Sequence, residues 1–308
     1  MRVVRGLEDS PGVPTAVTIG NFYAVHKGHQ SLIRKVRRRA GELDALATVL
    51  TFEPHPQKVL RGIAPPGLCT PEGKLELLER FGVDQVVILQ FTPELSRVEP
   101  EEFIERILVK ELAVKAIVVG SDFRFGRFAR GDVTMLKSYG RRLGFLVEGA
   151  RMAEADGQTI SSTAIRHALA EGDVRWAAKA LGRPYRLPGK VVHGAGRGRG
   201  LGFPTANLNP PPEVCVPGPG IYAGYTINAG RKRPSAISVG TNPTFGENPL
   251  SVESYVIDFE GDLYGQDVEF EFTARIRDHV AFPSVEALNE AIASDVEAAR
   301  QILGSGGR

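Results

Sequence analysis

The chain has 308 residues, of which 42% are hydrophobic and 24% charged, and this composition argues against a disordered or fibrous protein. Its 38 Lys and Arg nearly balance its 36 Asp and Glu, so the formal charge of +2 gives no support to nucleic-acid or membrane binding through bulk charge. The length suits about two domains.

The two cysteines, Cys69 and Cys215, stand far apart and form neither a disulfide scaffold nor a metal-binding spacing. This usage favours a reducing compartment. The first twenty residues contain charges and no long apolar run, so we expect no secretory signal. No stretch approaches the ~20 apolar residues of a membrane span. These features predict a cytoplasmic protein.

Short apolar runs alternate with helical patterns in the first part of the chain. Strands are expected at 16–19, 46–52, 86–89, 117–119 and 145–147. Helices are expected at 28–42, after the Thr70-Pro71 start signal, around 103–108, at 163–169 and at 174–181. This alternation predicts a parallel sheet that binds ligands at the carboxyl ends of its strands.

The pattern changes after Pro184, where 184–188 is predicted to be a linker. Beyond it, β-type runs at 190–193, 222–227, 236–239, 251–259 and 267–276 predict an antiparallel barrel or sandwich. Apolar residues at helical spacing between Val285 and Leu303 predict a last helix. We therefore expect two domains, residues 1–184 and 185–308.

Three segments of the first domain contain residues suited to phosphate chemistry. His26-Lys27-Gly28-His29 follows the first predicted strand at the start of a helix, where backbone amides and the helix dipole attract anions. The alternative without a functional role is a pair of surface histidines. The loop 120–126 follows a later strand, and 160–166 places hydroxyls and a cation at another helix start, where an ordinary helix cap is the alternative.

Together with Phe52-Glu53-Pro54-His55-Pro56, these segments resemble the nucleotidyltransferase superfamily, specifically the FMN adenylyltransferase module of prokaryotic bifunctional riboflavin kinase/FAD synthetases. The resemblance implies a Rossmann-like α/β fold in which His26 and His29 are catalytic. It implies a site for ATP and its phosphates that comprises Gly20, Asn21, Phe22, His26, Gly28, His29, Asp122, Ser162, Thr163 and Arg166.

The chain departs from the pattern of that family at two positions. The family pattern is Gly-x-Phe-Asp-Gly-x-His-x-Gly-His, and this chain has Tyr23 and Ala24 in place of the Asp and Gly. An Asp can bond backbone amides, and a Gly permits dihedral angles that cost Ala free energy. An alternative hypothesis is therefore a riboflavin kinase whose adenylyltransferase domain is impaired.

Glycine and arginine are concentrated at 193–202 in the second domain. The segment matches neither Walker A nor Gly-x-Gly-x-x-Gly, but such a loop can wrap phosphates through amides and guanidinium groups. An RNA contact or a disordered linker is the alternative. The specific segment Gly202-Phe203-Pro204-Thr205-Ala206-Asn207, which follows, argues against both.

That segment is similar to the signature of riboflavin kinases, as are Pro219-Gly220-Ile221-Tyr222-Ala223 and Gly240-Thr241-Asn242-Pro243-Thr244-Phe245. The resemblance implies a β-barrel fold with a C-terminal helix, with Glu253 as general base and Thr205 and Asn207 as Mg²⁺ ligands. The implied phosphate-binding residues are Gly194, Gly196, Arg197, Gly198, Gly202, Pro204, Thr205 and Asn207. The implied flavin-binding residues are Arg277, Phe282, Asn242 and Thr244.

The two resemblances together imply a two-domain transferase that uses ATP and Mg²⁺. The second domain would phosphorylate riboflavin to FMN, and the first would adenylylate FMN to FAD with release of pyrophosphate. Partners other than these small molecules are not expected, apart from weak self-association. A more distant alternative is RNA binding through the basic run 34–39, but apolar residues interleave that run at helical spacing, which favours a solvated helix face.

Overall fold

The computed structural model describes residues 1–7, 12–194, 202–240 and 250–304. The chain forms two compact units. The first comprises Met1–Pro65 and Pro71–Ser161, and the second comprises Pro66–Thr70 and Ser162–Arg308. Two predicted helices, at 163–169 and 174–181, therefore belong to the second unit. The expected functional boundary between residues 184 and 185 stays a prediction.

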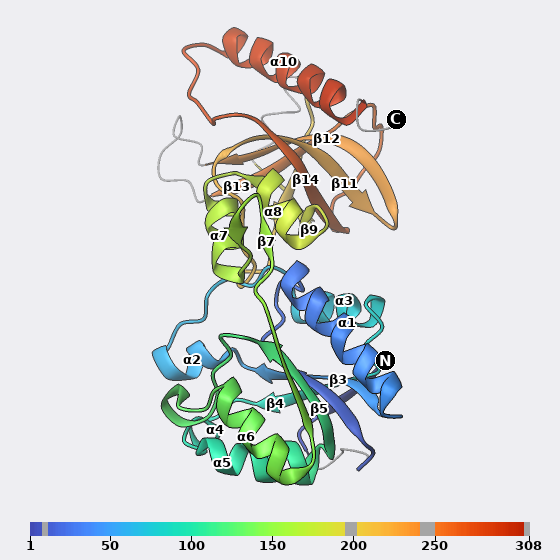
Figure 1. The fold of residues 1–308 in the computed structure, drawn as a ribbon. Helices are drawn as coiled ribbons and strands as arrows, with labels where there is room; N and C mark the ends of the chain where they lie inside the picture. Colours follow the sequence, from blue (N-terminus) through green and yellow to red (C-terminus); the bar gives the residue numbers. More distant parts are fainter. Residues whose placement is uncertain (8–11, 195–201, 241–249, 305–308) are drawn as a thin grey trace. The chain divides into compact units, whose positions relative to one another are not determined.

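The first unit is built on a six-stranded parallel sheet (Figure 1). The strands lie in the order β1 (Arg2–Arg5), β4 (Gln85–Gln90), β3 (Leu46–Glu53), β2 (Thr15–Ile19), β5 (Val114–Gly120) and β6 (Leu146–Ala150). The inner strands consist mainly of buried apolar residues, with buried threonines in β2 and β3, because helices cover both faces of the sheet. Because these strands are parallel, the loops after β2, β3 and β5 leave the same edge of the sheet, and the strand order reverses at β2. The predicted parallel sheet is confirmed.

Helices bury both faces of this sheet. On one face, Ile33 of α1 (Lys27–Glu42) and Leu78 of α3 (Pro71–Arg80) pack with Val49 of β3. On the other, Ile104 of the π-helix η1 (Phe103–Glu111) and Leu136 of α6 (Val133–Leu143) pack in a second cluster. The short elements of this unit are α2 (Pro56–Arg61), α4 (Pro93–Ser96), α5 (Pro100–Glu102), η2 (Arg127–Ala129), β7 (Glu154–Ala155) and β8 (Gln158–Thr159).

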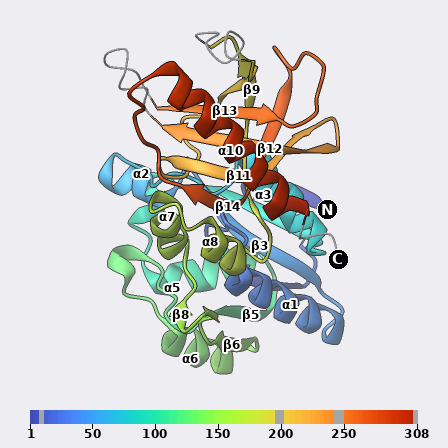
Figure 2. The same cartoon turned by 90° about the horizontal axis from the view of Figure 1, so that it is seen from above.

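The second unit contains a closed antiparallel barrel, which confirms the predicted β-barrel. Its strands follow the order β10 (Ala206–Asn209), β13 (Ser251–Val256), β12 (Arg231–Gly240), β11 (Gly220–Asn228), β14 (Asp267–Arg277) and β9 (Tyr185–Val192). The helices α7 (Ser162–Ala170) and α8 (Val174–Leu181) precede it. Helix α10 (Val285–Gly304) runs beside the barrel (Figure 2) and buries Val296, Ala299 and Leu303 in a cluster with Ala223 of β11.

The linker predicted at 184–188 is wrong from Tyr185 onward. Strand β9 begins there and pairs with β14, Tyr185 opposite Phe272. The Tyr185 side chain is buried, and its hydroxyl donates to the Cys215 carbonyl. Two prolines in five residues are typical of a linker between domains. Pro188 nevertheless occupies a strand position, at which it pairs with Glu269.

Candidate active sites

The first candidate site is the turn between β2 and α1, at the carboxyl edge of the parallel sheet. His26 caps α1, its Nδ1 accepting from the His29 amide at 3.3 Å, and the two imidazole rings stack with centroids 3.7 Å apart. The first carbon of a side chain at Gly28 would lie 3.0 Å from the His26 ring, so glycine makes room for this imidazole. The structure therefore brings His26, Gly28 and His29 together at a helix N-terminus.

The electrostatics of this turn favour a neutral His29. Burial, with a further contribution from His26, holds the pKa of His29 well below its ordinary value of 6.5. Within the part of the chain that the structure describes, His29 Nδ1 is buried without a hydrogen-bond partner. A neutral imidazole carries a proton on one ring nitrogen, and that nitrogen can donate a hydrogen bond to a phosphate oxygen that enters the site.

Neighbouring loops bring further predicted residues to this edge. Asn21 Nδ2 lies 3.2 Å from Nε2 of His55, which connects the loops after β2 and β3. Asp122 lies in the loop after β5, with its Oδ1 folded toward Gly120. Phe22 is buried and its ring centroid lies 4.6 Å from that of His29. The loops after β2, β3 and β5 thus place these predicted residues at the carboxyl edge of the sheet, and their contact with a nucleotide stays a prediction.

Ser162, Thr163 and Arg166 lie on α7, which belongs to the second unit. The Arg166 Nε donates to the Pro66 carbonyl at 2.6 Å, and burial lowers the pKa of this guanidinium from its ordinary value. The contact of Ser162, Thr163 and Arg166 with the triphosphate stays a prediction.

The second candidate site is on the barrel, where Thr205 and Asn207 meet Glu253. Asn207 of β10 pairs in register with Glu253 of β13. The Thr205 hydroxyl donates to Glu253 Oε2 at 2.9 Å. The Asn207 side chain lies so close to Gly194 that any side chain at Gly194 would collide with it. All three side chains are partly exposed, so they can reach a ligand.

The predicted flavin-binding pair lies at the end of β14. The Arg277 guanidinium carbon is 5.3 Å from the centroid of the Phe282 ring. The same guanidinium forms a two-pronged pair with Asp295 of α10, Nε to Oδ1 at 2.8 Å and Nη2 to Oδ2 at 2.6 Å. Gly202 adopts a left-handed φ of 83°, and Pro204 is exposed. Outside the described residues lie Gly196, Arg197, Gly198, Asn242 and Thr244.

Sequence reasoning missed two charged side chains near these sites. Asp295 could have been found, because a carboxylate three residues after Ile292 interrupts the apolar stripe of the last helix. Lys74, on α3, is completely buried, and its position in the sequence does not distinguish it from a surface lysine.

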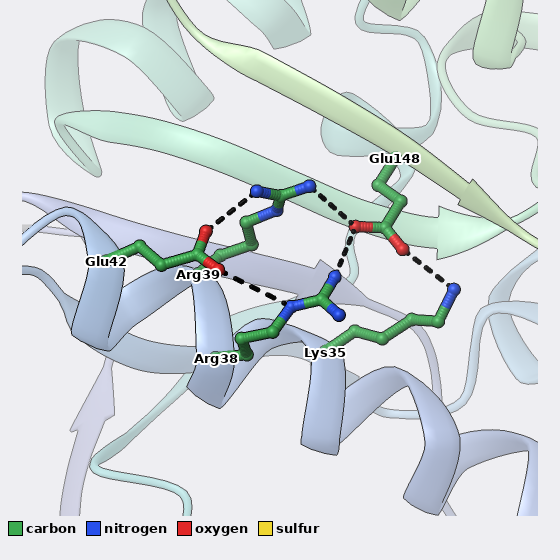
Figure 3. A network of polar contacts seen from close by, with 5 residues as sticks. All are labelled: Lys35, Arg38, Arg39, Glu42 and Glu148. Atoms are coloured by element: carbon green, nitrogen blue, oxygen red, sulfur yellow. Dashed lines mark hydrogen bonds and ion pairs between the residues drawn. The ribbon is translucent and has the colours of Figure 1, made fainter.

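The basic run of α1 forms ion pairs with acidic side chains (Figure 3). Glu148 of β6 accepts from Lys35 at 2.7 Å and from Arg38 and Arg39 at 3.2 Å each, while Glu42 pairs with both arginines. The hydrogen bond from Lys35 is the largest cause that lowers the pKa of Glu148. These contacts fasten α1 to β6 and give the basic run a structural role.

The fold and the two sites define an enzyme of nucleotide and phosphate transfer, with a parallel α/β unit and a β-barrel unit in one chain. The profile of the FAD synthetase family matches residues 10–164, and that of riboflavin kinase matches residues 181–303. The chain therefore belongs to the bifunctional riboflavin kinase/FMN adenylyltransferase family, which confirms the resemblance seen in the sequence.

Relatives with that description align along nearly the whole chain. The one from Haemophilus influenzae is 39% identical, over 99% of this chain and 100% of the relative. Those from Pseudomonas fluorescens and Escherichia coli K12 are 38% and 35% identical and cover 98% and 99% of this chain, with 98% of each relative. A crystal structure from Streptococcus pneumoniae, described as a macrolide-efflux protein, superposes with a TM-score of 0.89 at 31% identity, over 97% of this chain and 99% of that one. Among the residues described for this chain, no helix is long and apolar enough to cross a membrane.

Proposed function

We propose that the barrel site transfers the γ-phosphate of ATP to the 5′-hydroxyl of riboflavin, and that the β2–α1 turn joins the resulting FMN to the AMP part of a second ATP. Both family profiles and the full-length relatives support a transferase with these two activities. The observation that carries the residue assignment is the Thr205–Glu253 hydrogen bond, beside an Asn207 that pairs in register with Glu253.

In the kinase reaction, Glu253 acts as general base. Its carboxylate takes the proton of the riboflavin 5′-hydroxyl as the oxygen attacks the γ-phosphorus, and ADP leaves. The Thr205 hydroxyl holds one carboxylate oxygen and so orients the base. Arg277 and Phe282 would contact the flavin, with Asp295 holding the guanidinium in place.

The oxygen donors around Glu253 fit Mg²⁺, a hard cation that binds oxygen ligands and retains waters. Asn207 of β10 has an amide oxygen, and Thr205, which directly precedes β10, has a hydroxyl. These two residues would hold the ion, which when bound neutralises charge on the ATP phosphates.

In the adenylyl transfer, the FMN phosphate attacks the α-phosphorus of ATP and pyrophosphate departs. His26 and His29 would donate hydrogen bonds to the oxygens on which charge increases, at a helix N-terminus that favours anions. Ser162, Thr163 and Arg166 would bind the triphosphate. We infer that both reactions take place in the cytoplasm, without nucleic-acid or membrane partners and with at most weak self-association.

The variant Glu253→Gln tests the assignment of the base. FMN formation should fall by about 10²–10⁴-fold while ATP binding persists, because the amide keeps the shape and cannot accept the proton. Glu260→Gln, at an exposed carboxylate of the same unit, is the matched control. Near-normal turnover of Glu253→Gln would remove Glu253 as the base.

The alternative with an impaired adenylyltransferase is tested by giving the protein riboflavin and ATP and separating the products. We expect both FMN and FAD. FMN without FAD would favour the alternative, and Tyr23→Asp combined with Ala24→Gly should then raise FAD formation if the turn chemistry is the cause. Ala24 is buried and does not have a left-handed φ, which supports an active turn, because Ala pays no free energy for its dihedral angles there.

A further inference from the structure

Lys74 is a fully buried lysine near the adenylyltransferase turn. Its side chain has 0% exposure, and its ammonium lies 3.0 Å from Glu53 Oε1 at the end of β3. A buried ammonium needs close partners, since it has lost its hydration. Glu53 is 26% exposed and also pairs with Arg5 at 3.3 Å, so its charge is shared between two cations.

The second partner of Lys74 is the ring of Tyr23. The ammonium lies 4.7 Å from the ring centroid, within the range at which the π face attracts a cation, and this attraction strengthens when the cation is desolvated. The Tyr23 ring is also 5.7 Å from that of His55. Tyr23 therefore connects the β2–α1 turn to α3 and to the loop after β3.

This connection lies in a strained stretch of backbone. Phe22 and Val25, on either side of Tyr23 and Ala24, have φ values of 55° and 40°. A left-handed conformation costs free energy for bulky or β-branched residues and persists only where the surroundings hold it. The strained turn leads directly into His26, which caps α1 and stacks on His29.

We propose that Tyr23 and Lys74 form a positioning pair that holds the turn in the geometry needed by His26 and His29. In this chain the contact between the Tyr23 ring and the buried Lys74 ammonium would hold the turn, at a position where the family pattern has an Asp. The inference rests on the proposed adenylyl transfer at this turn and assigns that reaction two residues that do not touch its substrates.

The test compares Tyr23→Phe, Tyr23→Trp and Tyr23→Leu in the full chain. FMN formation at the barrel is an internal control, and Tyr139→Leu is a matched one, because Tyr139 faces the exposed Arg142 at 4.2 Å in the same unit. The Phe and Trp variants keep a π face and should form FAD from FMN and ATP within about 2-fold of the parent. The Leu variant should lose about 10-fold in kcat, with little change in the KM for ATP.

Adding Lys74→Met to Tyr23→Leu should cost less than the product of the two single effects, because the two residues act through one contact. Near-normal kcat in Tyr23→Leu, an equal loss in Tyr23→Phe, or an equal loss in Tyr139→Leu would overturn the proposal.

Amide hydrogen exchange of residues 20–29 separates this inference from the proposed function. Protection should fall in Tyr23→Leu and persist in Tyr23→Phe, whether or not the parent forms FAD. Absence of FAD from the parent would contradict the adenylyl transfer. Equal protection in the Leu and Phe variants would contradict the positioning pair. If Tyr23→Leu does not fold, a Tyr23→Trp variant with lower kcat and lower protection than the parent would overturn it as well.

Discussion

Removing Asp295 from its buried pair with Arg277 should cost far more stability than removing one partner of an exposed ion pair with similar bond lengths. The change is Asp295→Asn, which keeps the shape of the side chain and removes its charge. The Asp295 side chain is 8% exposed and that of Arg277 28%, and the pair joins α10 to the end of β14 through two charge-assisted hydrogen bonds of 2.6 and 2.8 Å. Removing one partner leaves a poorly hydrated guanidinium without its counter-charge.

The magnitude follows from this partial burial. Breaking a buried pair costs about 3–5 kcal/mol. Arg277 keeps some water contact and its bond to the Asp278 carbonyl, so we expect about 2–3 kcal/mol. For a unit of this size that corresponds to roughly 5–10 °C in the melting temperature of the barrel. Calorimetry of the full chain measures it. The KM for riboflavin should rise as well, because the guanidinium that faces Phe282 loses its anchor.

Asp258→Asn provides the control, because Asp258 pairs with a residue of the same helix. Asp258 forms a two-pronged pair with Arg300 of α10 at 2.6 Å for both bonds, but its side chain is 70% exposed. Solvent screens such a pair, so its loss should shift the melting temperature much less. Equal shifts in the two variants would refute the argument that burial sets the contribution, and an unchanged KM in Asp295→Asn would refute the positioning of Arg277 for the flavin.

Three further predictions concern the first unit. Folding depresses the pKa of His29, so below pH 6.5 the unfolded chain binds a proton that the folded chain does not. The free energy of unfolding should therefore fall as the pH drops below 6.5. In urea titrations at several pH values, His29→Gln should weaken this pH dependence. Glu148 has a lowered pKa in the folded protein, so the stabilisation from its pair with Lys35 should be present above pH 4.5 and lost as the pH falls through the folded pKa. The difference in unfolding free energy between the parent and Glu148→Gln should shrink over that interval. A constant difference would contradict this prediction. Gly28→Ala should displace the His26 ring and lower FAD formation roughly 10-fold, leaving FMN formation as the unaffected control, and a normal FAD rate would show that the ring adjusts freely.

Much of the fold could be predicted from local patterns. The alternation of apolar runs and amphipathic helices predicts a covered parallel sheet, and all five strands expected in the first part are present. Strand β1 was not predicted, because Arg2 and Arg5 flank only two apolar residues at the sheet edge. Strand β10 was not predicted either, because Ala206–Asn209 is short and rich in asparagine. Such segments become strands because neighbours supply their hydrogen bonds, and these neighbours are distant in sequence.

The sequence by itself determined the two kinds of unit and the residues suited to phosphate chemistry, because periodicity and short motifs depend on neighbours along the chain. Only the tertiary structure decided which of those residues meet. The register between β10 and β13 places Asn207 opposite Glu253, and the packing of α3 buries Lys74 beneath Tyr23. Burial and charge pairing between segments far apart in the chain depend on long-range packing, which no local pattern contains.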